Sequence, residues 1–194
     1  MKKILALIAC CIVSLPALAF DVAQVPPMKQ SRAGQYLDAA EANALKGELG
    51  TKAYFVDVRT RAEVSYVGMA TPADANIPYV EHPYDAPWDD KNARFKLDVN
   101  SDFGPELARR MELAGLGKND AVILICRSGD RSARAASLLA DLGYTRVYSV
   151  VDGFEGDAVK DGPRAGQRVL NGWKNAGLPW SYRLEKSKMY FPKF

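Results

Sequence analysis

The sequence predicts an α/β fold, in which a mostly parallel sheet is covered by helices. Three short apolar runs, at residues 53–58, 121–125 and 146–151, have the length and composition of buried strands. Segments with helical spacing of apolar residues and with helix start and stop signals separate or follow these runs. Strands that alternate with helices are typical of α/β domains, so we expect one such domain in this chain.

The N-terminal segment has the three regions of a secretory signal peptide. Lys2 and Lys3 precede an apolar stretch at residues 4–15, and the small residues of Pro-Ala-Leu-Ala follow at 16–19. We expect cleavage after this last segment and export to a bacterial periplasm. No membrane span is expected, because a span needs roughly 20 apolar residues and the polar segment 21–35 follows too soon.

Lipoprotein processing is the alternative for this segment. Residues 7–10, Leu-Ile-Ala-Cys, resemble a lipobox whose Cys10 would become a lipidated N-terminus. Only residues 4–9 would then form the apolar core, which is shorter than the roughly 7 to 15 residues that a signal peptide uses. We therefore favour cleavage after Ala19 over an anchor at Cys10.

Removal of residues 1–19 leaves Cys126 as the only cysteine, because Cys10 and Cys11 are lost. Exported proteins usually pair their cysteines in disulfides, so a single cysteine indicates a reactive thiol or an intermolecular bridge. The formal net charge falls from +3 to +1, and the chain has no basic block and no stripe of interleaved basic and aromatic residues. Nucleic-acid binding therefore has little support.

The domain is expected at residues 36–184, between a proline-containing leader at 20–35 and a tail at 185–194. Capping boxes of Asp38 with Glu41 and of Thr60 with Glu63 start its first two helices. The expected elements are, in order, a helix at 38–48, a strand at 53–58, a helix from 60 to about 68, a short strand at 75–77, a helix at 103–114, a strand at 121–125, a helix at 131–142, a strand at 146–151 and a short helix within 173–180.

Two long segments lack a core pattern. Residues 69–102 contain four prolines, and residues from about 153 to 172 are rich in glycine and charge. Loops of this length in a compact domain are commonly functional. We expect the first to form a surface excursion and the second an insertion, each able to serve as a lid or a partner surface near Cys126.

The segment of greatest chemical interest is Cys-Arg-Ser-Gly-Asp-Arg-Ser at residues 126–132. It follows a buried strand directly and opens a helix, so backbone N–H groups and the positive end of the helix dipole converge on it. Such a loop stabilises a thiolate or a bound anion, and Cys126 is the expected nucleophile. The alternative is an inert cysteine buried at the end of a strand.

The two arginines of the loop provide its fixed positive charge. Arg127 and Arg131 are suited to bind a sulfonate or carboxylate. Alternatively, Arg127 points to solvent and Arg131 pairs with an acid of the scaffold, for which Asp57 at the end of a buried strand is the candidate. Arg59 is then expected to bind elsewhere in the scaffold, and both Asp57 and Arg59 would have a supporting role.

The remaining loop residues have smaller expected roles. Gly129 is expected at a positive φ or where a ligand approaches the backbone. Ser128 and Ser132 can donate hydrogen bonds to a persulfide, although Ser132 is equally suited to a helix start. Asp130 opposes an anion if it points inward, so we expect it to face solvent, where it would favour a neutral or cationic acceptor.

The only histidine does not suggest a second catalytic group. His82 lies in a proline-rich segment, where a surface position is a simpler interpretation than a general base. Neither His82 nor Cys126 has companion ligands at metal-binding spacing, so a metal site is disfavoured.

On these motifs, the chain resembles the rhodanese family of sulfurtransferases. The matching segments keep their order from about residue 36 to 180: Phe-Val-Asp-Val-Arg at 55–59 with Glu63 after it, Ala-Asn-Ile-Pro at 75–78, the loop at 126–131 with Ser132, Leu-Gly-Tyr at 142–144 and Gly-Trp-Lys-Asn-Ala-Gly-Leu-Pro at 172–179. The resemblance implies a rhodanese-like three-layer fold with a central, mostly parallel sheet flanked by helices. The insertion at about 153–172 departs from the family pattern.

The resemblance also implies a reaction. Cys126 would take sulfane sulfur from an anionic donor such as thiosulfate, hold it as a persulfide and pass it to cyanide or to a thiol, which a protein could carry. No cofactor is implied. One alternative is a rhodanese-like module that carries sulfur or binds a partner without turnover. The other is a cysteine phosphatase or arsenate reductase, but those enzymes use a Cys-x5-Arg loop, whereas only four residues separate Cys126 from Arg131.

Overall fold

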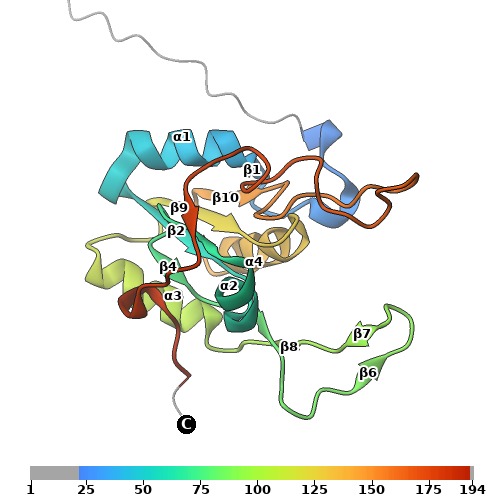
Figure 1. Ribbon diagram of the computed structural model, residues 1–194. Coiled ribbons are helices and arrows are strands. Elements are labelled where there is room, and N and C mark those ends of the chain that lie inside the picture. The colour runs from blue at the N-terminus through green and yellow to red at the C-terminus, as the bar shows by residue number, and fades with distance from the viewer. Residues whose placement is uncertain (1–21, 193–194) are drawn as a thin grey trace, which may run out of the picture.

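A computed structural model describes residues 22–192; the expected signal peptide at 1–19 lies outside the described residues. The centre of the domain is a five-stranded parallel sheet with the order β1-β10-β9-β2-β4 (Figure 1). Its strands are β1 (Gln35–Leu37), β2 (Ala53–Asp57), β4 (Ala75–Asn76), β9 (Ala121–Ile125) and β10 (Val147–Val150).

The helices form a layer on each face of the sheet. They are α1 (Ala39–Leu49), α2 (Arg61–Val67), α3 (Phe103–Leu113) and α4 (Asp130–Asp141). Because successive side chains of a strand point to opposite faces, β2 divides its residues between two cores. Val56 packs with α3 and α4, whereas Phe55 packs with α1, α2 and Trp173. The expected α/β, three-layer architecture is confirmed.

Most of the expected elements form close to their expected positions. Both capping boxes are present: Asp38 and Thr60 each accept a backbone N–H three residues on, and Glu41 and Glu63 reach back. The strand at 121–125 matches β9, since its five residues are apolar and fully buried. Strand β1 was not expected, because three residues after a proline-containing leader carry too short a pattern.

The helix expected within residues 173–180 is wrong. The segment forms turns: Ala176 donates to Gly172 as in a helix, but Gly177 then donates to Lys174, three residues back, so the helical pattern does not continue. Before them, Trp173 donates to Gly153 at 2.9 Å and Lys174 to Phe154 at 3.0 Å. The indole Nε1 of Trp173 then donates to the carbonyl of Pro179, also at 2.9 Å. These bonds hold the segment against the residues that follow β10.

The excursion at 69–102 has structure of its own. Its strands pair in antiparallel fashion, β5 (Val80–Glu81) with β8 (Asp98–Val99) and β6 (Trp88–Asp89) with β7 (Arg94–Phe95). The β6–β7 hairpin extends away from the sheet (Figure 1). The remaining short elements are β3 (Met69–Ala70), which pairs with β11 (Trp180–Ser181), and the 3-10 helices Val22–Gln24, Pro27–Lys29, Gly50–Lys52 and Lys186–Lys188.

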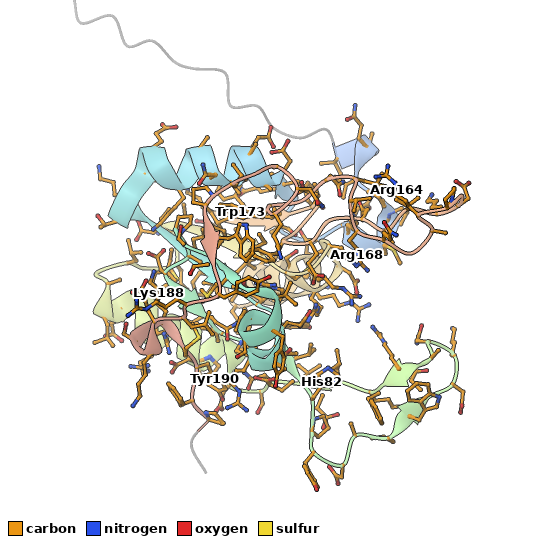
Figure 2. The ribbon with its side chains drawn as sticks, viewed as in Figure 1. His82, Arg164, Arg168, Trp173, Lys188 and Tyr190 are labelled. Atoms are coloured by element: carbon orange, nitrogen blue, oxygen red, sulfur yellow. The ribbon has the colours of Figure 1, made fainter. Side chains whose placement is uncertain are left out.

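The leader and the insertion lie side by side. Lys29, almost fully buried, donates to the Asp157 carboxylate at 2.7 Å. The insertion forms a hairpin with one bridge between Ala158 and Arg168. Figure 2 shows Arg164 and Arg168 along it, while Trp173 lies within the body of the domain. No helix within residues 22–192 is long and apolar enough to cross a membrane.

Candidate active site

Cys126 lies at the junction between the central strand β9 and helix α4. The residue is 1% exposed, and its thiol is free rather than in a disulfide. The backbone N–H of Gly129 donates to the sulfur at 3.1 Å, and the Ser132 hydroxyl lies 3.5 Å from it. Helix α4 begins at Asp130, so the positive end of its dipole is directed at this sulfur. The local field therefore favours negative charge on the sulfur.

The loop around Cys126 depends on two glycines. Gly129 has φ +99°, as expected, and a Cβ there would overlap the carbonyl oxygen of Val151. Gly153 has φ +66°, and a Cβ there would lie 2.5 Å from the backbone nitrogen of Ser128. The residues after β10 therefore pack directly against the back of the loop and fix its shape.

The hydroxyl of Ser132 is held in place by a second buried hydroxyl, that of Ser149. Ser149 in β10 is fully buried, and its hydroxyl lies 3.0 Å from the Ser132 hydroxyl. Ser132 in turn contacts the carbonyl of Gly129 at 3.0 Å and the sulfur of Cys126. Sequence reasoning missed Ser149, although a serine inside an apolar strand was a signal that a buried partner exists.

Arg131 pairs with Glu63 rather than with Asp57. Its two terminal nitrogens each donate to one oxygen of the Glu63 carboxylate at 2.6 Å. Burial alone would raise the pKa of Glu63, but the hydrogen bonds and charge of Arg131 lower it to about 2. For Arg131 the signs are reversed: burial alone would lower its pKa, but the hydrogen bonds and charge of Glu63 outweigh burial and raise it. The expected pair with Asp57 is wrong because the second capping box fixes Glu63 beside the first turn of α4.

Asp57 instead binds Arg59, two residues along the chain. Both side chains are fully buried, and a guanidinium nitrogen of Arg59 donates to Asp57 at 2.6 Å and to the carbonyl of Gly68 at 2.7 Å. The guanidinium also lies 3.9 Å above the ring of Phe154. Arg59 thus binds elsewhere in the scaffold, as expected, at Gly68 and Phe154, but the turn after β2 also brings it back onto Asp57, which was not expected. The Phe154 N–H donates to the Cys126 carbonyl at 2.8 Å, so this pair is linked to the loop through Phe154.

Arg127 is a half-buried cation that forms no ion pair within 4 Å with any residue between 22 and 192. Its Nε is buried and has no hydrogen-bond partner among the described residues. Burial lowers the pKa of its guanidinium, and the positive charges of Arg168 and Arg131 lower it further, against smaller opposing effects of Glu63 and Glu155. Arg127 thus lines the cavity described next rather than pointing freely to solvent.

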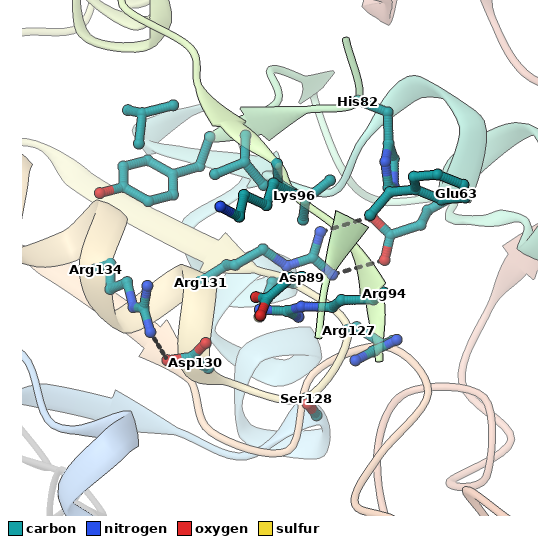
Figure 3. A pocket seen from close by; sticks show the side chains of 16 residues that line it. Glu63, His82, Asp89, Arg94, Lys96, Arg127, Ser128, Asp130, Arg131 and Arg134 are labelled. Carbon is teal, nitrogen blue, oxygen red and sulfur yellow. Dashed lines mark hydrogen bonds and ion pairs between the residues drawn. The ribbon is translucent and has the colours of Figure 1, made fainter. Parts of the chain in front are cut away.

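The site opens into a cavity of about 460 Å³ above the loop (Figure 3). Ser128 and Asp130 line it on the loop side, and the Asp130 side chain, 39% exposed, pairs with Arg134 at 3.2 Å. Asp130 thus faces solvent only in part. The opposite wall comes from the excursion, which contributes His82, Asp89, Arg94, Phe95 and Lys96. Within residues 22–192, no cluster of three or more His, Cys, Asp and Glu side chains is placed to hold a metal ion.

Comparisons with known proteins agree with this arrangement. The model of the rhodanese-like domain matches residues 38–158. Uncharacterized protein RP600 of Rickettsia prowazekii is 30% identical over 134 residues, which cover 69% of this chain and 87% of that protein. Thiosulfate sulfurtransferase 16, chloroplastic, of Arabidopsis thaliana is 34% identical over 100 residues, or 52% of this chain and 69% of that protein.

A solved structure matches as well. The crystal structure of Rv0390 from M. tuberculosis superposes with a TM-score of 0.58 at 27% identity, covering 76% of this chain and 97% of that one. The matched family model includes β2, β9, the Cys126 loop and α4. The chain therefore belongs to the rhodanese-like family, which includes sulfurtransferases.

Proposed function

We propose that this protein is a sulfurtransferase that carries sulfane sulfur as a persulfide on Cys126. The observation that carries the proposal is the contact of the Gly129 N–H with the sulfur, at 3.1 Å, at the start of α4 and at the base of a basic cavity. A hydrogen bond from a backbone N–H to a charged acceptor contributes about 1.5 to 3 kcal/mol. The same donor can serve the thiolate before transfer and the persulfide after it.

The first half-reaction is a displacement at sulfur. The Cys126 thiolate attacks the outer sulfur of a donor such as thiosulfate, a new S–S bond forms, and sulfite leaves with the electron pair of the broken S–S bond. In this proposal Arg127 receives the sulfonate oxygens, since it is the loop arginine that forms no ion pair among residues 22–192. No external electrons enter this step, so it requires no redox cofactor.

The second half-reaction returns Cys126 to its thiolate. A nucleophile, such as cyanide or an acceptor thiolate, attacks the outer sulfur of the persulfide. The bond between the two sulfurs breaks, and its electron pair returns to Cys126. Arg131 is engaged by Glu63 through both terminal nitrogens, which argues against its use as a clamp for a phosphoryl group.

A turnover assay tests this proposal. With thiosulfate and cyanide, the wild-type protein is expected to form thiocyanate over many turnovers, and Cys126→Ser none. A rate that survives in Cys126→Ser would contradict the proposal. A single turnover in the wild type would favour a sulfur-carrying or partner-binding module, and hydrolysis of a phosphate ester would favour the phosphatase alternative.

We also propose that the protein is exported after cleavage behind Ala19. The support is the arrangement of residues 1–19, which is typical of a signal peptide. Mass spectrometry of the N-terminus of the processed chain distinguishes a start at Phe20 from a lipid-modified Cys10. An unprocessed chain in the cytoplasm would refute export.

A further inference from the structure

Lys29 in the leader is a buried cation that packs against the Cys126 loop without lining the cavity. The residue is 8% exposed, and a Cβ on Gly129 would lie 3.0 Å from the Cδ of Lys29. Gly129 carries the N–H that donates to the Cys126 sulfur. An effect of Lys29 on the reaction therefore passes through the loop and not through a bound donor or acceptor.

The ammonium group of Lys29 links the leader to the base of the insertion (Figure 1). Its Nζ donates to one carboxylate oxygen of Asp157 at 2.7 Å. The other oxygen accepts from the side-chain amide of Asn171 at 3.1 Å, and the Asp157 N–H donates to the side-chain oxygen of Asn171 at 2.7 Å. Asn171 thus fixes the carboxylate that Lys29 binds.

The base of the insertion also binds the loop directly. The N–H groups of Glu155 and Gly156 donate to the Arg127 carbonyl at 3.0 and 3.3 Å, and Asp157 follows them in the chain. Lys29 packs on the loop, and its partner Asp157 is joined to the loop through these two hydrogen bonds. The ion pair between them therefore closes a ring of contacts around the loop.

The burial of Lys29 sets this ion pair apart from the other one that the leader forms. The side chain of Lys29 is 10% exposed, whereas Arg32 and Asp141 form a pair whose side chains are 64% and 52% exposed. A nearly buried ammonium group is costly unless it is paired. Between residues 22 and 35, the leader thus buries a charge only where it meets the Cys126 loop.

We propose that Lys29 is a positioning residue, whose ion pair with Asp157 holds the Cys126 loop in the shape that directs the Gly129 N–H at the sulfur. The inference rests on the sulfurtransferase function proposed above and concerns the same site. Glycine has wide conformational freedom, so contacts from neighbouring segments must fix the direction of its N–H. The loop needs this shape twice, because the N–H serves the thiolate before transfer and the persulfide after it.

The rate of persulfide formation on the full chain tests the inference. Lys29→Met keeps an unbranched side chain against Gly129 but removes the charge. With thiosulfate in a single turnover, its maximal rate is expected to fall about tenfold, which is part of what an N–H bond to a charged acceptor contributes. The half-saturating thiosulfate concentration is expected to change less than twofold, because neither Lys29 nor Asp157 lines the cavity.

A double variant separates positioning from stability. Asp157→Asn leaves Lys29 charged and nearly buried, so it should unfold at a lower urea concentration than wild type. Adding Lys29→Met removes the unpaired charge and should restore most of the urea midpoint, whereas the maximal rate should stay about tenfold below wild type. A rate that recovers together with the urea midpoint would show a purely structural role and overturn the inference.

Arg32→Gln is the matched control, because Arg32 belongs to the same leader and its exposed partner Asp141 is the last residue of α4. It is expected to keep the wild-type rate. A wild-type maximal rate in Lys29→Met, or a change confined to the half-saturating thiosulfate concentration, would overturn the inference alone, since the persulfide would still form. Failure of the wild type to form the persulfide would overturn both the proposed function and this inference.

Discussion

The ion pair between Glu63 and Arg131 is expected to stabilise the loop junction, and Glu63→Gln measures how much. The two side chains are 20% and 14% exposed, so solvent screens them little. A pKa of about 2 for Glu63, against an ordinary value of 4.5, corresponds to about 3 kcal/mol at neutral pH. The raised pKa of Arg131 describes the same interaction and is not added to this figure.

The pH dependence has a definite sign. The pKa of Glu63 is lowered in the folded state, so its stabilisation is complete above pH 4.5 and is lost as the pH falls toward 2. Urea unfolding of wild type and Glu63→Gln should therefore differ by about 3 kcal/mol at pH 7, and the difference should shrink toward zero near pH 2.

The control for this experiment is Glu81→Gln. Glu81 pairs with Arg61, whose side chain is 47% exposed, so the loss should stay below about 1 kcal/mol. A Glu63→Gln variant that loses no more than Glu81→Gln at pH 7, or a loss independent of pH, would refute the reasoning.

Three further predictions concern the scaffold. Asp57→Asn leaves Arg59 charged and buried, so it should lower the free energy of unfolding by about 3 to 5 kcal/mol and the melting temperature by on the order of 10 °C. Asp141→Asn removes an exposed pair with Arg32 and should have little effect in the same thermal scan. Gly129→Ala should abolish persulfide formation, because the new Cβ would overlap the Val151 carbonyl. Gly115→Ala, at φ +74° with open space around it, should lose only about 1 kcal/mol of stability and keep the activity. Equal outcomes for the two variants would contradict the role of the loop shape. Burial raises the pKa of Asp152 to about 6, so the free energy of unfolding falls as the pH rises from about 4 to 6 and the buried carboxyl loses its proton. Asp152→Asn should therefore unfold at a higher urea concentration than wild type at pH 7.5, and at the same concentration near pH 3.5. A variant that gains no stability at pH 7.5 would show that the charged carboxylate of Asp152 does not destabilise the fold.

The sequence was informative where local chemistry decides structure. The capping boxes at Asp38 and Thr60, the strand at 121–125 and the positive φ of Gly129 depend on neighbouring residues, and each formed as expected. The sequence was less informative for contacts between distant segments. The partner of Arg131 depends on how the start of α2 meets α4, which no local pattern encodes. The partner of Asp57 is local, because Arg59 lies two residues along the chain, but the strand pattern does not show that the turn after β2 folds back.

The wall of the cavity was the least predictable part of the site. Arg94 and Lys96 lie in a segment whose only sequence signals were prolines and missing periodicity, and a hairpin of two-residue strands leaves no pattern to recognise. Ser149 was missed for a related reason, because its hydrogen bond to Ser132 crosses from β10 to α4. Such residues are found only once the fold brings their segments together.

The most direct test of the account is intact-protein mass spectrometry after thiosulfate treatment, followed by peptide mapping. The account predicts one added sulfur atom on Cys126 in the wild type, removed by cyanide, and none in Cys126→Ser. An unchanged mass in the wild type, or added sulfur that persists when Cys126 is replaced, would contradict it.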